Sequence, residues 1–276
     1  MSTPTIAPTV GRRETPHGTF ATLETPGSAD SALVVLLHSM GTSKRMYEHV
    51  IPHLGNSRCV ALDVFGHGES DRPAFEYTIP DHARALADLI GDLRSGGEPI
   101  VLVGCSLGAI IAVELAATEP DLVDGLLLNG CPGGHLEAQR TARMRTLSTK
   151  LLGSDGFPLP DAEMPGTAMA ASAEEHAARR EDVALCGRWL LSTQWATTAY
   201  DLVARLHRIQ ATTAVLFGEL DFWLPTAYTL IEGIERSQLE IVEGAGHLTP
   251  YDAPGAVADE VHRLEQRVRA SSRSAP

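Results

Sequence analysis

Six short apolar runs, each followed by a stretch with helical spacing, constrain the fold of this 276-residue chain more than any other feature. The runs are continuous rather than alternating, which is typical of strands buried on both faces of a parallel sheet. Strand–helix–strand alternation predicts an α/β fold, with a mostly parallel central sheet and helices on both faces. The predicted strands are residues 33–37, 59–64, 100–103, 126–128, 214–217 and 239–242.

Helix signals fill the stretches between these runs. Thr78, followed by Pro80 and Asp81, is typical of a helix start with Thr78 as the cap. The helix that follows is predicted to bury one apolar stripe, made of Leu86, Leu89, Ile90 and Leu93. Residues 109–117 are apolar nearly all round, which predicts a helix inside the body of the protein. Asp252 is expected to cap a last helix, whose apolar face carries Val257, Val261, Leu264 and Val268.

The strand pattern stops between residues 132 and 208. This segment has helically spaced apolar residues and a loop rich in Pro and Gly at 153–166, but no convincing strand. We therefore predict a helical cap insertion that lies over one edge of the sheet. The predicted boundaries are a core domain of residues 17–131 and 209–270, a cap of residues 132–208, and flexible tails at 1–16 and 271–276.

Composition limits which binding partners and which cellular compartment we expect. With 22 basic and 35 acidic residues the formal charge is −13, which argues against nucleic acid or an anionic membrane surface as a partner. The N-terminus lacks the apolar segment of a secretory signal, and every apolar run is too short to span a bilayer. None of the four cysteines forms a C-x-x-C pair, so neither a zinc ribbon nor a dithiol redox motif is predicted. Three of the four lie in apolar runs or next to them, as buried free cysteines do, so a reducing, cytoplasmic environment is the simpler prediction. A homodimer is a reasonable expectation.

The sharpest chemical signal is the sequence Gly104-Cys105-Ser106-Leu107-Gly108, which has the pattern G-x-S-x-G. The pattern alone is weak, but here it joins a predicted strand to a predicted helix. Such a turn exposes the serine hydroxyl at the carboxyl edge of the sheet, and the Leu107 amide points at the same spot from a helix N-terminus. Ser106 is therefore predicted as a nucleophile; the alternative is a small-residue turn in which the serine only caps the helix.

A serine hydroxyl needs a base, and among the eleven histidines position selects His247. This residue follows the last predicted strand in a glycine-rich loop, which can return the imidazole over the strand ends. The imidazole in turn needs an acid that fixes its tautomer. Asp221 is predicted for this role because it lies at a loop tip after the preceding strand. Glu219, closer to the strand end, is the rival acid.

The remaining histidines have simpler interpretations. His49 and His53 are four residues apart, but no carboxylate completes a ligand set, so no metal site is predicted. Four histidines lie in polar helical stretches and are expected to face solvent, namely His82, His176, His207 and His262.

The order Ser106, Asp221, His247 on this alternation of elements resembles the α/β-hydrolase superfamily. The resemblance extends from about residue 19 to residue 268 and implies the α/β-hydrolase fold with a helical cap. It also implies that His247 deprotonates Ser106, which attacks a carbonyl to give an acyl-enzyme that water then releases. That chemistry requires no metal or organic cofactor.

Two loops carry the resemblance further. The segment His38-Ser39-Met40-Gly41 is similar to the His-Gly oxyanion loop, which implies that the Met40 and Leu107 amides form the oxyanion hole. Ser39 stands where glycine is usual, so the second donor stays open. The segment from Asp63 to Ser70 resembles the D-x-x-G-x-G-x-S turn, in which Ser70 is expected to fix the loop and His67 to have no catalytic role. Lys44 and Arg45 either meet an acidic substrate or cap the next helix in solvent.

The substrate is less constrained than the reaction. A small, largely apolar ester or lactone is expected, because the loop after residue 38 is similar to those of enol-lactonases. The alternatives are a carbon–carbon bond hydrolase of vinylogous diketones, a cofactor-free haloperoxidase or perhydrolase, and a non-catalytic ligand-binding member. Epoxide hydrolases and haloalkane dehalogenases are disfavoured, because they use an aspartate where this chain has Ser106. Besides Met40 and Leu107, the pocket is predicted to be lined by Trp189, Trp195, Phe222, Trp223 and Leu248.

Overall fold

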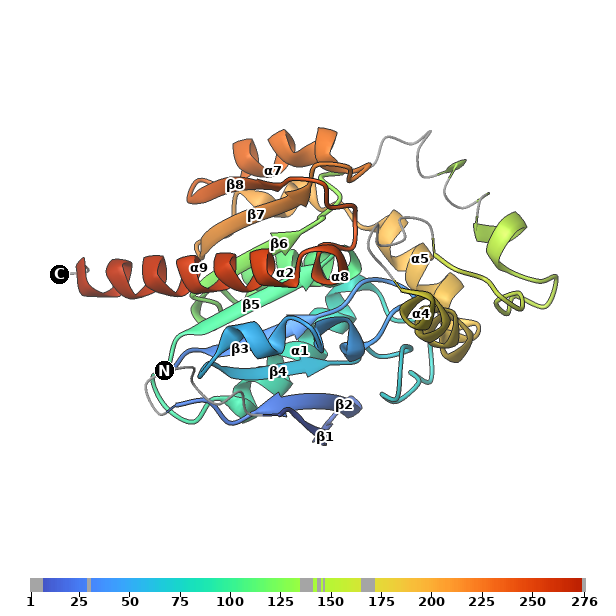
Figure 1. The fold of residues 1–276 in the computed structure, drawn as a ribbon, viewed down its shortest axis with the longest axis horizontal. Coiled ribbons are helices and arrows are strands. Elements are labelled where there is room, and N and C mark those ends of the chain that lie inside the picture. The colour runs from blue at the N-terminus through green and yellow to red at the C-terminus, as the bar shows by residue number, and fades with distance from the viewer. Residues whose placement is uncertain are drawn as a thin grey trace.

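Eight strands form one sheet at the centre of the computed structural model, which describes residues 7–28, 31–134, 141–142, 145, 147–164 and 172–274. In space the strands follow the order β1-β2-β4-β3-β5-β6-β7-β8, and all neighbours from β4 to β8 are parallel (Figure 1). The predicted α/β fold with a mostly parallel central sheet is confirmed. The strands are β1 Thr9–Thr15, β2 Gly18–Thr25, β3 Leu33–Leu37, β4 Arg58–Leu62, β5 Ile100–Cys105, β6 Gly125–Asn129, β7 Thr212–Gly218 and β8 Ser237–Val242.

The strands β1 and β2 form an antiparallel hairpin that the sequence pattern does not predict. Thr9 pairs with Glu24, and Thr15 pairs with Gly18. β1 is an edge strand with mostly exposed side chains, so no apolar run marks it. The predicted tail at residues 1–16 is therefore wrong for β1. The tail predicted at 271–276 is also wrong as far as residue 274, because helix α9 (Pro254–Ser274) continues through it; residues 1–6 and 275–276 lie outside the described residues.

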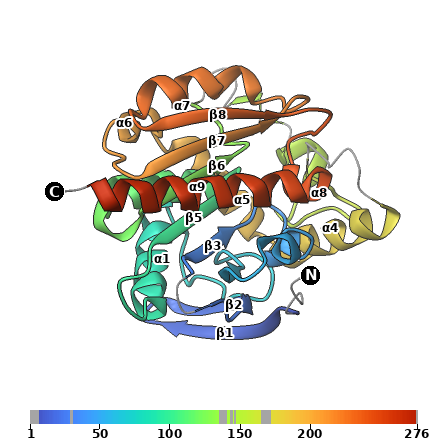
Figure 2. The same cartoon turned by 60° about the vertical axis from the view of Figure 1, so that its left-hand side comes forward.

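Helices cover both faces of the sheet, as predicted (Figure 2). One face carries α1 (Ile79–Leu93), α2 (Leu107–Thr118), η3 (Pro120–Leu122), α6 (Val203–Leu206), η5 (Leu224–Thr226) and α7 (Ala227–Gly233). The other carries η1 (Lys44–Tyr47), η2 (Ile51–Leu54), α8 (Thr249–Asp252) and α9. Alternate residues of β3 belong to the hydrophobic cores on the two faces of the sheet. Leu33 and Val35 pack on the α1 side, and Val34 and Leu36 pack on the α9 side.

Local sequence signals explain where these helices begin. Thr78 caps α1 through a capping box, in which it accepts from the Asp81 amide and Asp81 accepts from the Thr78 amide. The predicted apolar stripe of α1 is buried, and so is α2 along almost its whole length. Asp252, which is predicted to cap the last helix, is the last residue of α8, and its Oδ2 accepts a hydrogen bond from the Gly246 amide at 2.8 Å. All four cysteines are free and buried.

The chain between β6 and β7 leaves the sheet and returns to the neighbouring strand position. The described elements of this insertion are η4 (Leu147–Leu151), α4 (Ala173–Cys186), α5 (Trp189–Ala199) and α6. Figures 1 and 2 place α4 and α5 beyond one end of the parallel strands, on the side where the chain passes from β5 into α2. Among the helically spaced apolar residues predicted in this segment, Met144 lies outside the described residues, whereas Leu147 and Leu151 begin and end η4. None of the helices in the described ranges combines the length and the hydrophobicity needed to cross a membrane.

Candidate active site

Ser106 occupies the sharp turn between β5 and α2. Its backbone has φ 52° and ψ −104°, a strained conformation for a residue with a side chain. A Cβ on Gly104 would collide with the backbone of Gly108, and a Cβ on Gly108 would collide with the backbone of Leu37. The strand and the helix can approach this closely only because both positions are glycine. The predicted strand-to-helix turn at Ser106 is thus present in the structure.

Leu107 and Met40 line the same cavity as this serine. Leu107 is the first residue of α2, and Met40 belongs to the segment after β3. The Gly108 amide donates to the His38 carbonyl at 3.1 Å, which ties the start of α2 to that segment. Among the described residues, neither the Met40 amide nor the Leu107 amide has a hydrogen-bond acceptor. Both amides therefore keep an unused donor, and both residues line a cavity together with Ser106.

His247 is paired with Asp221 at the ends of β7 and β8. His247 Nδ1 lies 2.9 Å from Asp221 Oδ2 and 3.0 Å from Oδ1, and both side chains are buried. The Trp223 amide donates to Asp221 Oδ1 at 2.8 Å and fixes the carboxylate. Glu219 points elsewhere: it is exposed, and its Oε2 accepts from the Gly244 amide at 3.0 Å. Of the two rival acids, the structure brings Asp221 to the imidazole.

Gly130 is a residue of this site that the sequence analysis does not identify. It follows β6 with φ +55°, and a Cβ on it would lie 3.0 Å from both Asp221 Oδ2 and His247 Nδ1. Its neighbour Asn129 accepts a hydrogen bond from the Ser106 amide at 2.9 Å. The end of β6 thus supports the serine turn on one side and the His247–Asp221 pair on the other. A glycine directly after a buried strand is the sequence signal for it.

Ser106 and His247 line the same cavity, which lies between the strand ends and the insertion and has a volume of about 30 Å³. Such a volume holds about one water molecule. Met164 lies against Gly41, where a Cβ would collide with it, and helps to close the cavity. The other lining residues are Ser39, Met40, Thr42, Leu107, Ile110, Pro132, Glu163, Arg179, Val183, Thr197 and Leu248.

The predicted pocket residues divide into three groups. Met40, Leu107 and Leu248 line the cavity beside Ser106. Trp189 and Trp195 line a separate cavity of about 420 Å³, because α5 turns Thr197 rather than its tryptophans toward Ser106. Phe222 packs beside His247 instead, and Trp223 packs beside Phe222. The Phe222 ring packs 4.8 Å from the His247 ring and 5.5 Å from the Trp223 ring, between centroids.

A model of the alpha/beta hydrolase family matches residues 34–260, which is most of the chain. The chain belongs to this family. An esterase of Mycobacterium tuberculosis (strain ATCC 25618 / H37Rv) is 29% identical over 265 residues, covering 88% of this chain and 85% of that protein. A 2-hydroxy-6-oxo-6-(2'-aminophenyl)hexa-2,4-dienoic acid hydrolase of Metapseudomonas resinovorans is 27% identical, covering 80% of this chain and 79% of that protein.

The fold has solved counterparts as well. The crystal structure of the enol-lactonase from Burkholderia xenovorans LB400 matches with a TM-score of 0.77 at 21% identity, covering 92% of this chain and 99% of that one. This likeness supports the alpha/beta hydrolase fold, and the family match with the esterase and hydrolase relatives supports hydrolytic activity.

Three histidines of this alpha/beta hydrolase are buried near the site without contacting Asp221. His38 Nε2 accepts from the Val64 amide at 2.9 Å, and the His67 ring lies 5.3 Å from the His38 ring. Burial lowers the pKa of His38 and, further, that of His67. The prediction that His82 faces solvent is wrong. It packs edge-on against Tyr77, and burial lowers its pKa to about 4, so it is neutral at pH 7.

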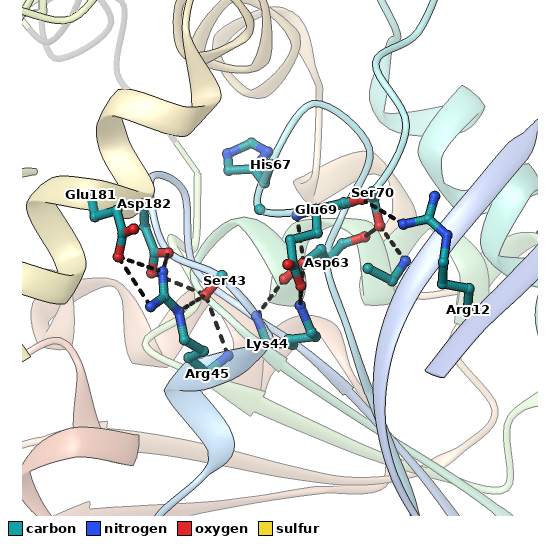
Figure 3. A network of polar contacts seen from close by, with 12 residues as sticks. Arg12, Ser43, Lys44, Arg45, Asp63, His67, Glu69, Ser70, Glu181 and Asp182 are labelled. Atoms are coloured by element: carbon teal, nitrogen blue, oxygen red, sulfur yellow. Dashed lines mark hydrogen bonds and ion pairs between the residues drawn. The ribbon is translucent and has the colours of Figure 1, made fainter. Parts of the chain in front are cut away.

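Lys44 is almost fully buried and does not line the cavity; Figure 3 shows it beside Asp63 and Glu69. Its Nζ lies 2.9 Å from Asp63 Oδ2 and 2.6 Å from Glu69 Oε2, and its side chain is almost fully buried. Asp63 is completely buried and also accepts from the Lys44 and Glu69 amides. Ser70 fixes the same loop, because its Oγ donates to the Asp63 carbonyl and accepts from the Ala21 amide. Both interpretations of Lys44 from the sequence are therefore wrong.

Arg45 connects the segment after β3 to the insertion. Its Nη2 lies 2.7 Å from Asp182 Oδ1, and its Nη1 lies 3.2 Å from Glu181 Oε2; both acids belong to α4 (Figure 3). Ser43 Oγ donates to Asp182 Oδ2 at 3.0 Å. Burial raises the pKa of Asp182 to about 6, although Arg45 and Ser43 oppose the shift. The loop that carries Met40 is thus joined to the helix that carries Arg179.

Proposed function

We propose that this alpha/beta hydrolase is a serine hydrolase that cleaves a small carboxylic ester or lactone. The observation that carries the proposal is the shared cavity: Ser106, on a strained turn, and His247, paired with Asp221, open into one space. A nucleophile, a base and an orienting acid in that relation are the requirements of acyl transfer. The 29% identical esterase supports the same reaction class.

In the proposed reaction, His247 Nε2 takes the proton from Ser106 as its oxygen attacks the substrate carbonyl. Asp221 stays ionised on the opposite ring nitrogen and stabilises the imidazolium that forms. The Met40 and Leu107 amides donate to the oxyanion of the tetrahedral intermediate, and one donor of this kind is typically worth about 10²–10³ in turnover. His247 then protonates the leaving alcohol, and a water deprotonated by His247 releases the acyl group from Ser106.

A substrate needs more room than the cavity offers. Small-molecule sites usually enclose about 300–1,000 Å³, whereas about 30 Å³ is open beside Ser106. Met40 and Met164 line this space, and methionine side chains repack easily because they are long and unbranched. We propose that substrate binding displaces the side chain of Met164 from its place against Gly41.

A second reaction, hydrolysis of a carbon–carbon bond in a vinylogous diketone, uses the same three side chains. It is favoured by the similarity to the 2-hydroxy-6-oxo-6-(2'-aminophenyl)hexa-2,4-dienoic acid hydrolase, which extends over 80% of this chain. The two reactions are distinguished by comparing kcat/KM for a vinylogous diketone with kcat/KM for 4-nitrophenyl esters and simple lactones. A preference of more than about tenfold for the diketone, or 1.4 kcal/mol in transition-state binding, would favour this second reaction.

The test of the proposal is covalent labelling. A fluorophosphonate should label the wild type on the peptide that contains Ser106, and Ser106→Ala should stay unlabelled. Ser39→Ala is the matched control, because Ser39 lines the same cavity and lacks a base, so this variant should be labelled like wild type. His247→Ala should label slowly and lose about 10³-fold or more in ester turnover. A folded wild-type protein that resists labelling would contradict the proposal.

A further inference from the structure

Arg179 places a buried positive charge in the wall of the cavity that contains Ser106. The residue lies on α4, its side chain is 3% exposed, and it lines the cavity together with Ser106 and His247. Within the described part of the insertion, Glu163 is the other ionisable side chain of this wall. A guanidinium carries five N–H donors, so burial requires several acceptors around it.

Only part of the Arg179 guanidinium has a hydrogen-bond acceptor among the described residues. Its Nη2 contacts Glu163 Oε1, whereas its Nε and Nη1 are buried and have no hydrogen-bond partner among the described residues. The Tyr251 ring lies 5.7 Å from the guanidinium and offers a cation–π contact, which leaves the N–H groups unsatisfied. Buried donors of a charged group that lack acceptors are costly. The burial also lowers the pKa of Arg179.

The nearby carboxylates are already engaged by other groups. Glu163 Oε1 also lies 2.8 Å from His176 Nδ1, and Glu163 Oε2 lies 3.9 Å from Arg180 Nη1. Asp252 attracts Arg179 electrostatically, but its Oδ2 accepts from the Gly246 amide at 2.8 Å. Arg179 thus belongs to the cavity wall, and its Nε and Nη1 have no acceptor among the described residues.

We propose that Arg179 binds a carboxylate of the substrate, so that the enzyme acts on esters or lactones that carry a negative charge away from the scissile carbonyl. This inference rests on the proposed function, since it places the charged group in the same cavity as the reacting carbonyl. A carboxylate accepts strong, charge-assisted hydrogen bonds from a guanidinium, so it is the kind of acceptor that the N–H groups on Nε and Nη1 lack. It also departs from the largely apolar substrate that the sequence predicts.

A matched pair of esters tests the inference. Mono-4-nitrophenyl glutarate and 4-nitrophenyl pentanoate have the same leaving group and acyl length, and differ by a carboxylate in place of a terminal methyl group. Wild type should have the higher kcat/KM for the glutarate. Arg179→Met should reduce that value by roughly 10- to 100-fold, the size of a hydrogen bond to a charged group, and change the pentanoate value by less than about threefold. Arg179→Lys should recover part of the preference, since it restores the charge without the fork.

Arg180→Met is the matched control. Arg180 is the adjacent arginine on α4 and faces the same Glu163, but it does not line the cavity, so its loss should leave the ratio of the two kcat/KM values unchanged. Thermal unfolding of each variant checks that α4 remains folded. Equal loss for both esters in Arg179→Met, or no preference in wild type, would overturn the inference while leaving the proposed function intact.

A binding measurement separates the inference from catalysis. Titration calorimetry on the Ser106→Ala variant should detect monomethyl glutarate and lose it in the Ser106→Ala, Arg179→Met double variant. If wild type is not labelled by a fluorophosphonate but this binding is present, the proposed function fails and the anion site stands. If the binding does not depend on Arg179, the anion site is wrong, whatever the labelling shows.

Discussion

The backbone of Gly130 packs against the side chain of His247, so closely that a Cβ on Gly130 would lie 3.0 Å from His247 Nδ1. The same Cβ would lie 3.0 Å from Asp221 Oδ2, which is the atom that faces the imidazole at 2.9 Å. Three strand ends meet here, since Gly130 follows β6, Asp221 follows β7 and His247 follows β8. The separation of the acid and the base is therefore set partly by a residue that carries no chemistry.

Gly130→Ala should impair catalysis more than folding. The new methyl group must displace His247 or Asp221, and a shift of about 1 Å in a reacting group can cost about 10²-fold in rate. We expect kcat/KM for a 4-nitrophenyl ester to fall by at least that factor. The measurement is steady-state kinetics combined with thermal unfolding of the same preparation.

The matched control is Gly55→Ala. Gly55 has φ +62°, close to the φ +55° of Gly130, but no atom lies within 4 Å of a Cβ built on it. Both variants place a side chain at a positive φ, whereas only Gly130→Ala crowds the site. If Gly55→Ala lowered turnover as much as Gly130→Ala, strain rather than displacement of His247 would be the cause.

Asp221→Asn should be far more harmful than Glu219→Gln. An asparagine stabilises the wrong imidazole tautomer and carries no charge to balance the imidazolium, and comparable changes cost about 10⁴-fold in kcat. Glu219 contacts the Gly244 amide and not the imidazole, so its change should leave turnover within a few-fold of wild type. Ester kinetics on both variants at pH 7 provide the measurement, and the reverse order would assign the acid to Glu219.

The elements that position the proposed chemistry could be predicted because they carry strong local signals. The turn at Ser106 joins a buried strand to an apolar helix, with a glycine two residues before the serine and another two residues after it. Each of these features indicates the same strand-to-helix turn. His247 and Asp221 could be placed because parallel strands end at one edge of the sheet, so residues distant in sequence meet there.

Other features depend on contacts that sequence periodicity does not encode. β1 is exposed and polar, so its strand structure comes from pairing with β2 rather than from burial. Arg179 lies on a mostly polar helix, where the spacing of residues does not tell which charge turns inward. Trp195 is half-exposed for the same reason, since the orientation of α5 over the sheet is decided by tertiary packing.

Lys44→Met should destabilise the fold strongly. It leaves Asp63, which is fully buried, without its counter-ion, and removing one member of a buried pair typically costs about 3–5 kcal/mol. Glu69→Gln is the control, because the Glu69 side chain is 65% exposed and a surface ion pair is worth at most about 1 kcal/mol. Urea unfolding at pH 7 gives both free energies. Similar losses in the two variants would mean that Asp63 finds compensation elsewhere.

The titration of Asp182 should lower the free energy of unfolding of the wild type as pH rises from about 4 to about 6. Its pKa in the folded protein is about 6, above the ordinary value of 3.8, because burial disfavours the carboxylate more than Arg45 and Ser43 favour it. The folded state thus holds a proton in this interval that the unfolded state has lost. The stabilisation is complete below about pH 4 and is lost through pH 6, with a total of up to about 3 kcal/mol.

Asp182→Asn removes this titration, so the comparison isolates it from the other carboxylates. The free energy of unfolding of Asp182→Asn minus that of wild type should rise between pH 4 and pH 7, measured by urea unfolding at each pH. Glu181→Gln is the control for a lost contact to Arg45, because it keeps Asp182 and its hydrogen bond from Ser43. A difference that falls with pH would mean that Arg45 and Ser43 outweigh burial, so that the link between α4 and the Met40 loop favours the charged carboxylate; a constant difference would mean that the opposing effects cancel and that the pKa of Asp182 is not raised.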